Sequence, residues 1–120
     1  MSSANITHII EIGVGVDLVD ALFELARRRR RSIRVLNGRG VIEQVTLRQP
    51  TGRIVTLQGS FNIISMAGTI LPSSTLESAQ ELDVYLSSSS YEVIGGSVVS
   101  PLVASHPLVL TVVLYSDNAF

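Results

Sequence analysis

ITHIIEIGVGVDLVDALFELARRRR, residues 6–30, decides the fold class, because a strand pattern gives way to a helix pattern within it. Residues 6–12 alternate β-branched side chains between two faces, which predicts a strand. From Leu18 onward the apolar positions recur with helical spacing, and Asp17 is placed to cap the N-terminus of that helix. No other segment of the chain carries a convincing helix pattern.

The remainder of the sequence predicts strands separated by turns. Runs rich in Val, Ile, Thr and aromatic residues follow the helix: SIRVL, VIEQVTLR, IVTLQ, FNIISM, LDVYL, EVIGGSVV and LVLTVVLY. Turn residues separate them at 37–40 (NGRG), 49–52 (QPTG), 72–74 (PSS) and 87–90 (SSSS), and we expect hairpins between neighbouring runs. One helix against about seven strands predicts an α+β domain whose mostly antiparallel sheet is partly covered by the helix. The length predicts a single domain over residues 1–120.

Five consecutive arginines stand in a chain that contains no lysine and has a formal net charge of −1. If the helix continues through about Arg29, this run occupies its last turn and exit, where cations meet the negative end of the helix dipole. The alternative is nuclear import or an auxiliary contact with phosphate. That contact would involve Arg27, Arg28, Arg29, Arg30 and Arg31. Since the chain as a whole is slightly acidic, DNA binding by it alone is expected to be weak, salt-dependent and indifferent to base sequence.

Side chains suited to catalysis are scarce. The chain has no cysteine and no lysine, and its two histidines, His8 and His106, are far apart in the sequence. We therefore predict no catalytic residue, no metal site and no cofactor. Residues 13–18 (GVGVDL) resemble the start of a dinucleotide-binding turn, but Leu18 stands where the third glycine belongs. The two glycines are expected to permit a tight turn between strand and helix.

The composition is apolar and lightly charged, with 46% hydrophobic and 16% charged residues, which indicates that some apolar surface is buried between subunits. The longest apolar run, residues 108–115, is too short to span a bilayer as a helix. Residues 1–5 lack the features of a secretory signal. We expect a soluble protein with no membrane partner.

The order of these segments closely resembles a known domain. The most specific pieces are A-R-R-R at 26–29, V-T-L-R-Q-P at 45–50 and G-G-S-V-V at 95–99. They resemble the plants-and-prokaryotes conserved (PPC) domain of plant AT-hook motif nuclear-localised proteins, and the similarity extends from His8 to Tyr115. The resemblance implies a seven-stranded antiparallel sheet with one main helix, assembly into a homotrimer, and a nuclear location.

The resemblance also implies a function that is not enzymatic. A domain of this kind assembles with itself and with related family members, and it recruits other transcription factors. In the plant family a separate AT-hook, N-terminal to the domain, grips AT-rich DNA. No R-G-R-P hook occurs in these 120 residues. We therefore expect an excised domain or a member that has lost its hook, with DNA contacted by this chain only indirectly or weakly.

The plant family recruits its partners through a G-R-F-E-I-L motif. The matching stretch here is Gly59, Ser60, Phe61, Asn62, Ile63 and Ile64. Both charged positions of the motif are neutral in this chain, so the set of partners is expected to differ or recruitment to fail. Phe61 and Ile63 share one strand face, which allows a role in the core instead.

A small-molecule-binding or enzymatic domain of the prokaryotic type is the alternative. Its pocket would lie between subunits and contain His8 or His106. Some prokaryotic relatives carry histidines, a plausible metal cluster, in the regions that correspond to residues 83–85 and 95–97. Those residues contain no histidine here, so the resemblance also implies that no metal is bound.

Overall fold

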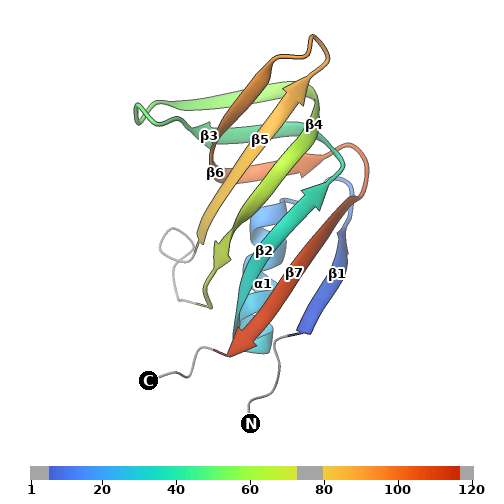
Figure 1. The fold of residues 1–120 in the computed structure, drawn as a ribbon, viewed down its shortest axis with the longest axis vertical. Coiled ribbons are helices and arrows are strands. Elements are labelled where there is room, and N and C mark those ends of the chain that lie inside the picture. The colour runs from blue at the N-terminus through green and yellow to red at the C-terminus, as the bar shows by residue number, and fades with distance from the viewer. Residues whose placement is uncertain (1–5, 73–79, 117–120) are drawn as a thin grey trace.

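The computed structural model describes residues 6–72 and 80–116, which form one helix and one seven-stranded sheet (Figure 1). In chain order the elements are β1 (Ile6–Ile12), α1 (Leu18–Arg29), β2 (Arg31–Arg39), β3 (Val41–Arg48), β4 (Ile54–Ile70), β5 (Gln80–Ser88), β6 (Val93–Ala104) and β7 (Leu108–Ser116). Every strand pairing is antiparallel. The α+β class and the seven-stranded antiparallel sheet are therefore confirmed.

The strand order is β1-β7-β2-β4-β3-β6-β5, and β5 also pairs with β4. This additional pairing closes β4, β3, β6 and β5 into a ring, while β1, β7 and β2 extend from the ring as an open sheet with α1 behind them (Figure 1). Within the described residues, β1 pairs with β7 alone, so its other side is a free sheet edge.

Helix α1 begins and ends where local chemistry predicts. The Asp17 carboxylate accepts a hydrogen bond from the backbone N–H of Val19 at 3.1 Å, and this confirms the N-cap. The helix ends at Arg29, and Arg30 follows in the left-handed conformation with φ 53°. The described elements include no helix with the length and apolar composition needed to cross a bilayer.

Two expected turns take a different form. The NGRG segment is not a hairpin, because β2 pairs with β7 and β4 while β3 pairs with β4 and β6. Residues 37–39 instead continue β2, and Gly40 turns the chain with φ 140° at a point where a Cβ would lie 2.5 Å from Leu108. The two strands expected at IVTLQ and FNIISM are one 17-residue strand, β4, because Gly59 (φ 149°) redirects the chain without ending it.

Residues 49–52 and 87–90 do connect hairpins, as expected. In the first, Gln49 N–H donates to Arg53 O at 2.8 Å between β3 and β4. In the second, Tyr91 N–H donates to Ser88 O at 2.9 Å between β5 and β6. The turn expected at 72–74 lies partly outside the described residues.

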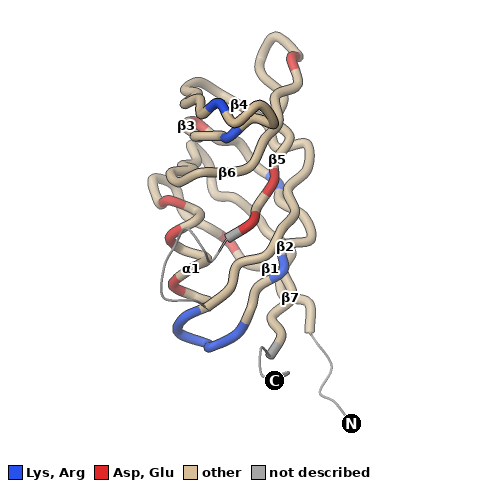
Figure 2. The backbone as a smooth tube through the Cα atoms, turned by 90° about the vertical axis from the view of Figure 1, so that its left-hand side faces the viewer, with Lys and Arg blue, Asp and Glu red and all other residues tan. Residues whose placement is uncertain are grey.

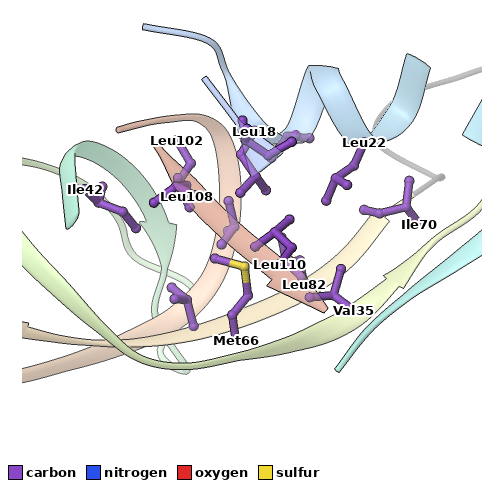
Figure 3. Packing of buried hydrophobic residues seen from close by; sticks show 14 of the residues in the cluster. Leu18, Leu22, Val35, Ile42, Met66, Ile70, Leu82, Leu102, Leu108 and Leu110 are labelled. Carbon is purple, nitrogen blue, oxygen red and sulfur yellow. The ribbon is translucent and has the colours of Figure 1, made fainter. Parts of the chain in front are cut away.

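The core fills the space between α1 and the inner side of the curved sheet (Figure 3). Leu18, Val19, Leu22 and Ala26 form the buried face of the helix. They pack with fully buried side chains from the strands, among them Ile42, Met66, Ile70, Leu82, Leu102, Leu108 and Leu110. Burying one such side chain contributes about 1.5–3 kcal/mol, so this continuous cluster stabilises the packing of α1 against the sheet.

Candidate functional site

The stretch matching the plant recruitment motif lies in the middle of β4. Phe61 is only 7% exposed, opposite Ile42 of β3, and Ile63 packs against the core. The backbone N–H of Ile63 also donates to Gly40 O at 3.1 Å. The core role anticipated for this pair is therefore confirmed.

The other side chains of this stretch face solvent. Ser60 and Asn62 are exposed, and they occupy the positions at which the plant motif has its two charges. Ile64 is 52% exposed at a register irregularity between Ile63 and Ser65. We call Ser60, Asn62 and Ile64 the β4 patch.

The arginine run forms the exit of α1, as expected. Arg27 Nη1 lies 3.3 Å from Glu24 Oε2, and its guanidinium carbon is 5.7 Å from the centre of the Phe23 ring. Arg28 and Arg29 complete the last turn, Arg30 is the left-handed residue, and Arg31 opens β2. All five side chains are exposed, and Figure 2 shows the backbone of this run as a continuous basic band at the end of the helix.

A cavity of about 370 Å³ lies beside this band. Arg29 and Arg31 line it together with His8 from β1, and Ile6 and Leu114 form its apolar wall. We call it the arginine pocket. Sequence reasoning considered the arginines and His8 separately, because nothing in the local pattern shows that β1 lies next to the helix exit.

A second cavity, of about 400 Å³, is formed by segments that the sequence did not predict as a site. Residues 48–50, Asp83, Tyr85 and 95–97 line it. Ser97 Oγ donates to Asp83 Oδ1 at 2.8 Å, and a Cβ at Gly95 would lie 2.5 Å from the Tyr85 ring. The sequence did mark these segments, since L-R-Q-P and G-G-S belong to the pieces that most closely resemble the PPC domain. The cavity could be recognised only once the pairing of their strands was known.

The structure separates the two histidines. His8 lines the arginine pocket, whereas His106 is exposed in the loop before β7 with its Nδ1 3.2 Å from Ser105 Oγ. Over residues 6–72 and 80–116, no three side chains from His, Asp and Glu come together as a metal site would require.

One face of the open sheet is not covered by any of the described elements. On β1, β7 and β2 the inward residues pack toward α1, while Ile9, Thr111 and Val113 lie on the opposite face. Ile9 is 73% exposed, the two β7 residues are half-buried, and no described helix or strand lies across them (Figure 1). We call this the outer sheet face.

Comparison with known proteins places these features in a family. Residues 1–116 match the Plants and Prokaryotes Conserved (PCC) domain. The chain is 43% identical over 117 residues to AT-hook motif nuclear-localized protein 26 and 42% identical over 113 residues to AT-hook motif nuclear-localized protein 18, both from Arabidopsis thaliana. The two matches span 95% and 94% of this chain, but only 34% and 43% of the length of the two relatives.

Solved structures share the fold at low sequence identity. A hypothetical protein from Salmonella superposes with a TM-score of 0.84 at 18% identity, covering 96% of this chain and 81% of that one. A plant- and prokaryote-conserved (PPC) protein from Pyrococcus horikoshii gives a TM-score of 0.73 at 18% identity, covering 98% and 84%. With the sequence match extending over residues 1–116, the chain belongs to the Plants and Prokaryotes Conserved (PCC) domain family.

Proposed function

We propose that this chain is the oligomerisation and protein-interaction domain of a nuclear, DNA-binding transcriptional regulator, and that it has no enzymatic activity. The relatives named as AT-hook motif nuclear-localized proteins support the nuclear setting and the regulator class. Because the chain spans only 34–43% of their length, an AT-hook elsewhere in a protein of this kind is proposed to make the main DNA contact.

The observation that carries the proposal is the uncovered outer sheet face. Ile9 is exposed and Val113 is half-buried on this face, and a second copy can bury this apolar surface. The same face also carries the exposed polar residues Thr7, Glu11 and Arg34. We propose that three copies, or copies of related family members, meet through this face. Residues 1–120 then act as a single domain within each subunit.

Recruitment of other transcription factors is assigned to the β4 patch. Its backbone is fixed by the Phe61 side chain in the core, so Ser60, Asn62 and Ile64 are presented on a rigid strand. The patch is neutral, whereas the plant motif is charged at two of these positions, and a different set of partners follows from that change.

The experiment compares partner capture by the wild type and two variants in nuclear extracts, read by quantitative mass spectrometry. We expect Ser60→Ala/Asn62→Ala/Ile64→Ala to lose at least about three-quarters of the captured transcription factors, since these side chains are the exposed part of the motif. Ser89→Ala/Ser90→Ala/Tyr91→Ala, in the exposed β5–β6 turn, is the matched control. Equal capture by all three proteins would remove the β4 patch from the proposal.

A further inference from the structure

We infer that the arginine pocket binds a backbone phosphate of duplex DNA, with Arg29 and Arg31 as the phosphate ligands. This deepens the proposed function, on which it rests for bringing the chain close to DNA, and it gives the domain a DNA contact of its own. The chemistry is that of the guanidinium group, which stays charged and presents a planar fork of donors to phosphate oxygens.

Three elements converge on this pocket. Arg29 ends α1, Arg31 opens β2, and His8 comes from the edge strand β1. The pocket thus combines two guanidinium groups and an imidazole with an apolar wall made by Ile6 and Leu114. A cavity of about 370 Å³ has room for a phosphate group and its adjoining sugar atoms.

The charges of the pocket have no acidic partner among residues 6–72 and 80–116. In the described residues the only ion pair of the run is Arg27 with Glu24, and Arg27 also lies over Phe23. Arg29 and Arg31 have no carboxylate within ion-pairing distance there. Adjacent like charges repel one another, so unpaired arginines at this position favour an external anion.

The backbone at Arg30 gives independent support. A residue that follows a helix in the left-handed conformation is usually glycine, because a Cβ makes that conformation unfavourable. This chain places an arginine there with φ 53°. Strained backbone positions cluster at functional sites, so the conformation of Arg30 supports a function for the basic band, although Arg30 itself does not line the pocket.

An extended polyanion fits the band better than a free phosphate does. Arg28 and Arg30 are neighbours of the pocket residues in sequence, and they are exposed but do not line the pocket. A DNA strand carries regularly spaced phosphates and can contact the pocket and a flanking arginine together.

The test measures fluorescence anisotropy of a labelled duplex of about 20 base pairs between roughly 25 and 200 mM salt. We expect Arg29→Gln/Arg31→Gln to weaken binding by roughly ten-fold at low salt and to reduce the slope of log K against log salt by about two. Arg48→Gln/Arg53→Gln removes the same charge from the β3–β4 hairpin, at the other end of the molecule, and should leave the slope unchanged (Figure 1). Arg27→Gln should have a smaller effect than either pocket arginine, because Glu24 already pairs with Arg27.

Circular dichroism melting checks that each variant is folded. The inference is overturned if the wild type does not bind the duplex at low salt, or if the hairpin variant loses as much affinity as the pocket variant. It is also overturned if pyrophosphate, added at constant ionic strength, binds the pocket while the duplex does not. The partner-capture experiment uses no labelled duplex. Loss of DNA binding in the anisotropy experiment and loss of partner capture are therefore separate results.

Discussion

Asp17 is the residue on which the junction between α1 and β6 depends. One carboxylate oxygen accepts from Val19 N–H at 3.1 Å and from Leu102 N–H at 2.9 Å, and the other accepts from the Ser100 hydroxyl. We expect Asp17→Ala to lower the free energy of unfolding by about 3 kcal/mol, because it removes the cap and leaves the Leu102 N–H without its acceptor. Urea denaturation at a fixed protein concentration measures the change.

Asp20 provides the control for this prediction. It is also acidic and lies in the first turn of α1, but it is exposed and interacts mainly with the helix dipole. Asp20→Ala should therefore cost less than about 1 kcal/mol. Equal losses for the two variants would show that the contacts of Asp17 with β6 contribute nothing.

For single residues, the sequence predicts contacts with near neighbours in the chain but not contacts with distant segments. The capping role of Asp17 was predictable from its position before an apolar helical pattern. Its bond to Leu102 joins residues 85 positions apart, and no local rule contains that information. The same limit applies to His8, whose place beside Arg29 and Arg31 depends on how β1 pairs with β7.

Among the elements, β4 is constrained most closely by its neighbours. At Gly68, opposite Leu82, the backbone of β5 approaches so closely that a Cβ would overlap Glu81 O and lie 2.6 Å from Leu82 Cα. Gly68 also has φ 158°. We expect Gly68→Ala to cost at least about 3 kcal/mol, because backbone atoms on both strands would have to move.

Gly95 of β6 provides the control for this prediction. It tests whether any added side chain destabilises the ring of strands formed by β4, β3, β6 and β5. A Cβ there would lie 2.5 Å from the Tyr85 ring, but Tyr85 is 54% exposed and its side chain can rotate away. Gly95→Ala should therefore cost less than about 1 kcal/mol in the same denaturation experiment. If Gly95→Ala proves as costly as Gly68→Ala, the close approach of backbone atoms is not the cause.

Element type was easier to predict than element pairing. The bounds of α1 and the period-two strands followed from side-chain patterns. NGRG has the composition of a hairpin turn, and only the neighbours of β2 and β3 show that these strands are not paired. Likewise Gly59 looks like a break between two strands, yet residues 54–58 pair with β3, and the strand continues through residues 61–70, which pair with β5.

For the whole molecule, candidate segments could be named from the sequence, but the places where they meet in the fold could not. The G-S-F-N-I-I stretch and the arginine run were both recognised as candidates, but the division of the former into buried Phe61 and the exposed β4 patch required the register of β4. The cavity between Arg48 and Tyr85 arises only once β3, β5 and β6 are neighbours.

Assembly through the outer sheet face can be tested with two exposed apolar residues. Ile9, 73% exposed, lies on that face, whereas Val93, 64% exposed, lies at the start of β6 next to the β5–β6 turn. We expect the wild type to sediment as three copies of the 12.9 kDa chain at micromolar concentration, and Ile9→Arg to sediment as a monomer because a desolvated charge would be placed in the interface. Val93→Arg should remain a trimer, since it makes the same change outside the face. A trimeric Ile9→Arg protein, or a wild type that is already monomeric, would show that the outer sheet face does not hold the subunits together.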